Sequence, residues 1–147
     1  MKKYIIILSI VFFVSTIYSA ELGFIVGTVN SNTGLNIGFS AGMGMLLPLL
    51  KVEYELTKNP DIGNKTITTG IKLKPKFGNF SPYALIGVGT DFEKFSLEFS
   101  SYSTFTLYGG GLYIYFSKLF SIRFDFRFMN YKTFNKTRLS GGIFLNF

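Results

Sequence analysis

The residues of this chain that could do chemistry are carboxylates, amines and guanidinium groups, because the sequence has neither histidine nor cysteine. Glu53 and Glu55 stand two positions apart, and two carboxylates on one face can act as general acid and general base. Asp125 lies between Arg123 and Arg127 at the same spacing. Alternate residues of a β-strand point to the same face, so each group of charges would share one side of its strand.

Ion pairing explains these charges better than catalysis does. A Ser or Thr nucleophile would lack its usual histidine base, and a chain without cysteine has no thiolate nucleophile, thiolate metal site or disulfide. We therefore predict that the protein is not an enzyme and needs no cofactor or metal. The charges are expected to form one interior network, made of Glu53, Glu55, Lys72, Arg123, Asp125, Arg127 and Arg138.

The elements that carry these charges are expected to be β-strands, because apolar residues recur at every second position. From Leu35 to Met45 they alternate with Asn, Gly and Ser, and from Ile122 to Phe128 they alternate with the charges named above. The connections are too short for crossover helices, so neighbouring strands must be antiparallel. The pattern predicts eight strands, at roughly 21–29, 34–46, 50–58, 65–75, 81–91, 103–116, 121–130 and 137–147.

The first 20 residues have the layout of a secretory signal peptide, helical in form and cleaved after Ala20. Two lysines precede an apolar run, and small polar residues follow it. The apolar run is short for a retained membrane helix, which needs about 20 residues. Residues 21–147 would then form one domain with a net charge of +5, since Lys2 and Lys3 leave with the leader. This charge is spread along the chain, which argues against nucleic acid as a partner.

Alternation alone leaves open whether the apolar face of the sheet points inward or outward. The polar face is rich in Gly and Ser and carries charges of both signs, which suits the crowded interior of a barrel. The predicted strands run about 9–14 residues, which is long enough for a tilted membrane strand of roughly 9–11 residues. Aromatic residues gather near strand ends, as at a lipid–water interface. One rim is predicted to hold Phe80, Tyr83, Phe116, Phe120 and Phe147, and the other Tyr102, Phe105, Phe128 and Tyr131.

The last strand carries the most specific resemblance to a known family. Apolar residues at alternate positions, including Leu145, lead to a final aromatic residue, Phe147, and this resembles the terminal strand of bacterial outer-membrane barrels. The segment 121–128 is similar to the penultimate strand of small OmpA/OmpX-like barrels. The resemblance implies an all-β, eight-stranded antiparallel up-and-down transmembrane barrel in the outer membrane. It also implies that Leu145 and Phe147 form the signal read by the barrel-assembly machinery.

The outward loops of such a barrel are the expected sites of interaction. In the longest loop, 91–103, an alternation of Phe95, Leu97 and Phe99 suggests a projecting hairpin that could accept a surface partner. The last loop is basic, with no acid nearby in the sequence. Four lysines are candidates for contact with lipopolysaccharide phosphates: Lys58, Lys65, Lys132 and Lys136.

A monomeric barrel with a structural or surface-interaction, adhesion-like role accounts best for these features. An eight-stranded barrel is just filled by side chains, which argues against an open pore. Two alternatives remain open at this point. One is a secreted, soluble lipocalin-like barrel that binds an apolar ligand, and the other is a narrow porin-like channel.

Overall fold

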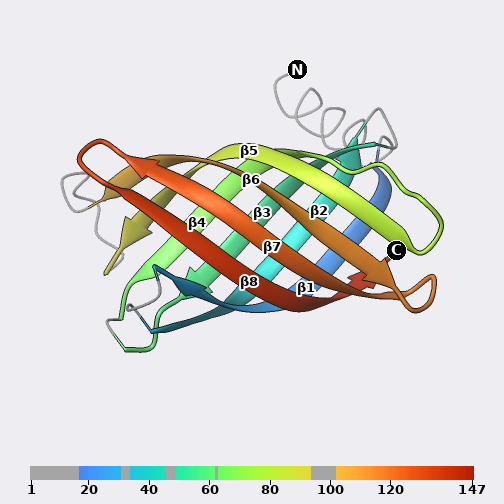
Figure 1. Cartoon of the computed structure of the whole chain (residues 1–147), viewed down its shortest axis with the longest axis horizontal. Coiled ribbons are helices and arrows are strands. Elements are labelled where there is room, and N and C mark those ends of the chain that lie inside the picture. Colours follow the sequence, from blue (N-terminus) through green and yellow to red (C-terminus); the bar gives the residue numbers. More distant parts are fainter. Residues whose placement is uncertain (1–16, 31–33, 46–48, 62, 94–101) are drawn as a thin grey trace, which may run out of the picture.

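The computed structural model describes residues 17–30, 34–45, 49–61, 63–93 and 102–147. Eight strands form a closed barrel, tilted and wrapped around a common axis (Figure 1). They are β1 (Ile17–Val29), β2 (Leu35–Met45), β3 (Leu50–Lys58), β4 (Lys65–Leu73), β5 (Phe80–Phe92), β6 (Ser103–Tyr115), β7 (Phe120–Tyr131) and β8 (Asn135–Asn146). The predicted all-β class and the eight antiparallel strands are confirmed. Within the described ranges, no helix is long and apolar enough to cross a bilayer.

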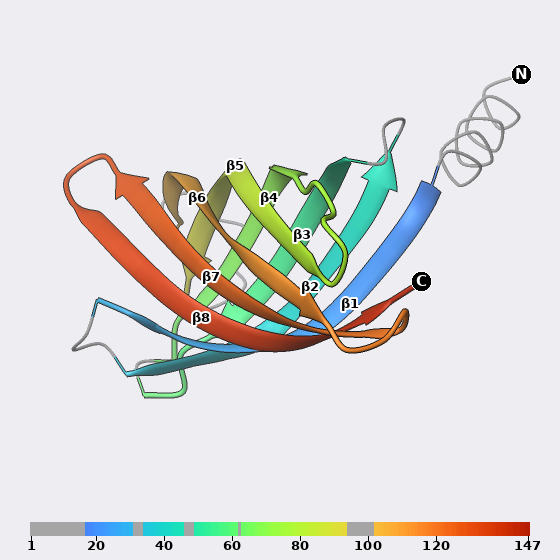
Figure 2. The same ribbon diagram turned by 45° about the vertical axis from the view of Figure 1, so that its right-hand side comes forward.

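Each strand pairs with the next one in the sequence, and β1 closes the barrel on β8 (Figure 2). This seam runs from the pair Glu21 and Asn146 to the pair Val29 and Arg138. We call the end of the barrel that holds the start of β1 and the end of β8 the terminal end. The opposite end, where β1 leads into β2 and β7 into β8, is the loop end.

The strand boundaries lie close to those predicted, and β1 shows the largest difference. It begins at Ile17 rather than at residue 21, because Ile17 and Ala20 pair with Met45 and Met43 of β2. The register shifts between these two pairs, whereas the pairing is regular from Ala20 onward. These first four residues of β1 belong to the predicted signal peptide. The division of the chain into a leader, 1–20, and a barrel domain, 21–147, stays a prediction.

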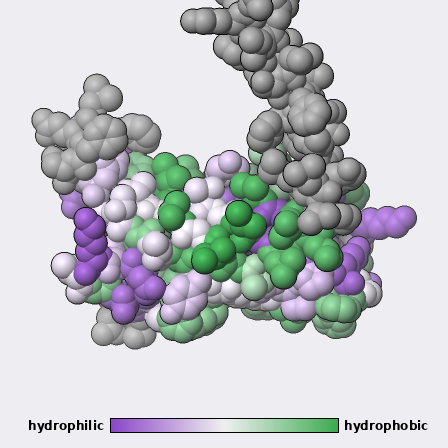
Figure 3. Space-filling model, turned by 90° about the horizontal axis from the view of Figure 1, so that it is seen from above, coloured by the Kyte–Doolittle hydropathy of each residue, from purple (hydrophilic) through white to green (hydrophobic). Residues whose placement is uncertain are grey.

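The apolar face of the sheet points outward. In the described part of the chain, 27 large apolar side chains are exposed but only ten hydrophobic side chains are buried, the reverse of a water-soluble domain. Figure 3 shows hydrophobic side chains over the middle of the barrel wall and strongly hydrophilic ones mostly toward its two ends. Phe39, Ile86 and Ile143 are each more than 60% exposed. A soluble barrel would leave this apolar belt in contact with water, whereas a membrane barrel covers it with lipid.

Some predicted rim aromatics lie inside the barrel instead. Phe80, Phe120 and Phe147 are exposed as expected, but Tyr83, Phe105 and Tyr131 are at most 9% exposed. The reason is their place in the alternation of each strand. The odd-numbered residues of β5, β6 and β7 point to the same side as Arg123, which is the interior, so the rings of Tyr83, Phe105 and Tyr131 fill it.

Small residues on the inner face make room for the long side chains. A Cβ atom added to Gly42 would lie 2.6 Å from Cγ of Glu21. One added to Gly23 would lie 2.4 Å from the ring of Phe144, which is fully buried. The interior is therefore packed rather than open, as expected for eight strands.

Candidate functional site

Glu53 is the centre of the charge network inside the barrel. Its Oε2 atom accepts hydrogen bonds from Lys72 Nζ at 2.9 Å and from Arg123 Nη1 at 2.6 Å. Its Oε1 atom accepts a bond from Arg127 Nη2 at 2.6 Å. One carboxylate on β3 thus joins β4 and β7 across the interior.

A second group of charges lies next to Glu53, on the side of the loop end. Glu55 Oε2 is 3.1 Å from both Arg123 Nη2 and Arg127 Nη2, and its other oxygen pairs with Arg138. Asp125 Oδ1 lies 2.8 Å from Arg127 Nε and 3.5 Å from Arg138 Nη2. Together the two groups bring all seven residues that the sequence singled out into one network.

Glu21 is the member of the network that sequence reasoning missed. It is fully buried and pairs with three lysines, with Lys51 at 3.1 Å and with Lys72 and Lys74 at short range. The segment 21–29 is apolar on both faces, so its alternation does not assign Glu21 to the interior. Lys51 and Lys74 could have been predicted from the alternation. Lys51 lies two residues before Glu53 on β3, and Lys74, just beyond β4, lies two residues after Lys72, so each shares the face of that charge.

Two tyrosine hydroxyl groups complete the hydrogen bonding of the network. Lys72 Nζ donates to Tyr113 Oη at 2.8 Å, and Tyr113 Oη donates to Glu21 Oε1 at 2.8 Å. Tyr83 Oη donates to Asp125. Buried charges are tolerated when they are paired and hydrogen-bonded in this way.

The network closes the middle of the barrel. The side chains there are at most 2% exposed: Glu53, Lys72, Tyr113, Arg123, Asp125, Arg127 and Phe144. On one side of them lies a cavity at the loop end of about 50 Å³, bordered by Arg138. On the other lies a cavity at the terminal end of about 240 Å³, bordered by Lys51 and Lys74. We call these two spaces the loop cavity and the terminal cavity.

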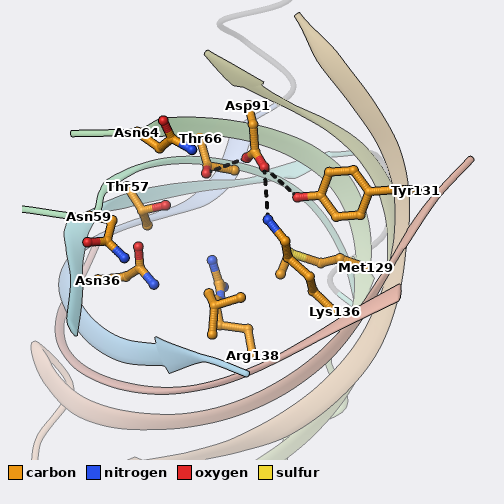
Figure 4. Close-up of a pocket in the computed structure, with 11 residues that line it drawn as sticks. Asn36, Thr57, Asn59, Asn64, Thr66, Asp91, Met129, Tyr131, Lys136 and Arg138 are labelled. Carbon is orange, nitrogen blue, oxygen red and sulfur yellow. Dashed lines mark hydrogen bonds and ion pairs between the residues drawn. The ribbon is translucent and has the colours of Figure 1, made fainter. Parts of the chain in front are cut away.

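Figure 4 shows the loop cavity, whose lining is mostly polar. Asp91 accepts hydrogen bonds at 2.6 Å from Thr66 Oγ1 and from Tyr131 Oη, and it pairs with Lys136 at 3.7 Å. Two buried donors at this mouth, Asn36 Nδ2 and Arg138 Nε, have no hydrogen-bond partner in the described part of the chain. The space is large enough for a small number of water molecules, which would satisfy these donors.

The four lysines predicted to meet lipopolysaccharide fall into two groups. Lys58 and Lys65 are directly opposite each other on β3 and β4, on the outward face, and Lys132 is exposed beyond β7. Lys136 instead turns into the mouth toward Asp91. The last loop has no acid nearby in the sequence, but Asp91 and Glu55 approach it from other strands and pair with Lys136 and Arg138.

The residues of the predicted assembly signal lie at the terminal end of the seam between β1 and β8. Leu145 is 39% exposed and pairs with Leu22 on β1 and Phe120 on β7, and Phe147 is 66% exposed. The hairpin residues Phe95, Leu97 and Phe99 lie outside the described residues. Across the described ranges, acidic side chains form no cluster of three or more that could hold a metal ion.

Solved structures similar to this one are outer-membrane and transmembrane barrels, although no protein-family model and no curated protein sequence matches the chain. The N-terminal β-barrel domain of Pseudomonas aeruginosa OprF superposes with a TM-score of 0.75 at 15% identity, covering 90% of this chain and 99% of that one. A designed transmembrane β-barrel gives 0.70 at 14% identity, with 88% and 95% covered. The attachment invasion locus protein Ail of Yersinia pestis gives 0.57 at 16% identity, with 88% and 97% covered.

These likenesses cover nearly the whole length of each barrel and agree with the inward charges and outward apolar belt. The described structure has the same closed ring of eight antiparallel strands. The chain has the fold of a small OmpA/OmpX-like outer-membrane β-barrel.

Proposed function

We propose that the protein is an integral outer-membrane barrel that is sealed in the middle and acts through the end of the barrel that faces the outside. The observation that carries this proposal is the combination of an apolar outer wall with an interior filled by paired charges. A lipocalin-like barrel holds its apolar ligand in a central cavity. Ion pairs occupy the centre of this barrel, so it has no space there for such a ligand. In this arrangement the terminal end faces the periplasm and the loop end faces the exterior.

The seal predicts that the protein conducts no steady ionic current. Purified protein in a planar lipid bilayer is expected to show no stable open channel, because the side chains that close the middle of the barrel are at most 2% exposed and few ions could pass them. A general diffusion porin reconstituted in the same way is the positive control. A stable, sizeable conductance from the folded, heat-modifiable form would contradict the sealed interior and favour the narrow-channel alternative.

The outward pair Lys58 and Lys65 supports a contact with lipopolysaccharide. Like charges directly opposite on neighbouring strands repel each other, and the register places these two lysines opposite each other. They lie on the lipid-facing side at the loop end of β3 and β4. Two phosphate-binding ammonium groups at the edge of the apolar belt suit the anionic headgroups of an outer leaflet.

Neutralising this pair is expected to reduce stabilisation by lipopolysaccharide. The double substitution Lys58→Gln, Lys65→Gln should remove about 1 kcal/mol per lysine of the extra unfolding free energy that lipopolysaccharide gives over zwitterionic lipid. Urea unfolding in both kinds of membrane measures this difference. Lys58→Arg, Lys65→Arg, which keeps both positive charges at the same positions, is the matched control. Equal losses in both double variants would contradict a specific contact.

A surface-binding role is the second part of the proposal. Ail, a neighbour in fold, is named for attachment and invasion, and the loop end of this barrel carries the exposed lysines and the ends of β5 and β6 that the segment 91–103 connects. The role proposed here is non-catalytic. Glu53 and Glu55, the pair suited by spacing to acid–base chemistry, are each held by several cations, which leaves neither of them free to transfer a proton.

A further inference from the structure

Cations outnumber carboxylates among the buried charges of the barrel. In the described part of the chain, six buried cations face four buried carboxylates. The cations are Lys51, Lys72, Lys74, Arg123, Arg127 and Arg138, and the carboxylates are Glu21, Glu53, Glu55 and Asp125. A buried charge without a counter-charge is strongly unfavourable. An excess of this kind therefore calls for an anion that is not part of the chain.

The excess is concentrated at the terminal cavity. Lys51 and Lys74 border it, and both rely on Glu21, which also pairs with Lys72. Two more lysines, Lys76 and Lys118, line its rim. The remaining acids of the described residues, at positions 61, 91 and 93, are at the loop end.

The lysines are arranged so that their ammonium groups remain available to a ligand. Among the described residues, Lys51 and Lys74 each give one side-chain hydrogen bond, to Glu21, and an ammonium group has three donors. Lys74 Nζ also lies 3.7 Å from the centre of the Tyr113 ring, and Lys76 Nζ lies 4.7 Å from that of Tyr115. These ring contacts position the cations without neutralising them.

We infer that the terminal cavity is a binding site for a phosphate group, held by Lys51 and Lys74 at its floor and by Lys76 and Lys118 at its rim. A volume of about 240 Å³ accommodates a phosphate with its first waters or a phosphate ester. The buried Oδ1 of Asn146, which lines the same cavity, has no hydrogen-bond partner in the described part of the chain. A hydrogen phosphate carries a hydroxyl group that can donate to such an acceptor, which a halide ion cannot do.

The phosphate can come from free inorganic phosphate or from a lipid headgroup, and the two sources are separable. In detergent micelles without phospholipid, ³¹P NMR titration with inorganic phosphate at constant ionic strength is expected to show saturable binding. Lys74→Gln should weaken that binding about tenfold, as loss of a charge-assisted bond does. Lys58→Gln, Lys65→Gln at the loop end should change it less than twofold. Glu21 keeps Lys51 and Lys72 in Lys74→Gln, so this variant is expected to fold.

The lipid arm uses nanodiscs of phosphatidylglycerol or phosphatidylcholine. If a lipid headgroup is the source, free phosphate competes poorly with the bound headgroup in both kinds of nanodisc. Lys74→Gln then releases the headgroup, and its protected ³¹P signal is lost. If phosphate, sulfate and chloride shifted the ³¹P signal of the headgroup equally, the effect would be simple screening of charge, and the proposed site would be overturned. So would unchanged binding in Lys74→Gln. The micelle arm does not depend on membrane orientation, so its failure is separate from failure of the proposed function.

The pH dependence gives a second readout. Burial, together with the charge of Lys72, lowers the pKa of Lys74 to about 8, despite the attraction of Glu21. Lys74 also faces Lys51 on β3 and Tyr113 on β6. Phosphate binding should therefore weaken as the pH rises through about 8, where Lys74 loses its proton. The Lys74→Gln variant should lack this step in phosphate binding. If Lys74 had only a structural role, the step would still be present in that variant.

Discussion

Replacing Glu53 by glutamine is expected to lower the free energy of unfolding of the barrel by about 3–5 kcal/mol, the range for breaking a buried ion pair. Glutamine keeps the shape of the side chain but removes its charge. Lys72, Arg123 and Arg127 would each lose a carboxylate contact of 2.6 to 2.9 Å while remaining almost fully buried. Urea unfolding of the protein in lipid vesicles, followed by the heat-dependent gel shift, measures the change.

Two further variants make this prediction testable even if Glu53→Gln fails to fold. Glu93→Gln removes an exposed carboxylate at the loop end and should stay within about 0.5 kcal/mol of the parent protein. Lys72→Met in the Glu53→Gln background removes one of the buried cations that lost the Glu53 carboxylate. It should recover part of the lost unfolding free energy. A Glu53→Gln protein as stable as Glu93→Gln would show that the network does not hold the barrel together.

Placing a charge on the outer wall is expected to have the second large effect. Ile86 lies in the middle of β5 and is 68% exposed, so Ile86→Lys should cost about 2–4 kcal/mol in a bilayer, the range for a lysine at the midplane. In water the same change at an exposed site would cost little. The measurement is again urea unfolding in lipid vesicles.

Leu119→Lys is the matched control for Ile86→Lys. Leu119 is 54% exposed but lies between β6 and β7 at the terminal end, outside the strands. A lysine near the interface costs about 0–1 kcal/mol. If Ile86→Lys were as stable as Leu119→Lys and appeared in the soluble periplasm, the apolar wall would face water. The secreted soluble barrel would then be the correct alternative.

The strands could be predicted from the sequence because period-two alternation is a local property. From Leu35 to Met45, each residue's neighbours alone decide which face it occupies, and the structure confirms the strand. Such reasoning fails where both faces are apolar. In β1, Leu22 and Phe24 point outward and Ile25 points inward, so only closure of the barrel assigns Glu21 to the interior.

The membership of the charge network was partly visible in the sequence, but its pairing was not. Parity places Glu53, Lys72 and Arg123 on the inner face of their own strands. Which of them meet depends on the tilt and stagger of the barrel, which are properties of the closed ring. Lys72 on β4 reaches Glu21 on β1, and no pattern within either segment could indicate that contact.

The seam between β1 and β8 has a consequence for the time course of folding. It joins residues more than a hundred positions apart, from Glu21 with Asn146 to Val29 with Arg138. The other seven pairings join strands that are consecutive in the chain, and these local hairpins can form early. The seam has to wait until the last strand has been synthesised. Until then both edge strands have unpaired backbone groups, a hazard in water and a still greater one in lipid. The ring therefore closes last, and the residues around Leu145 and Phe147 are the ones that complete it.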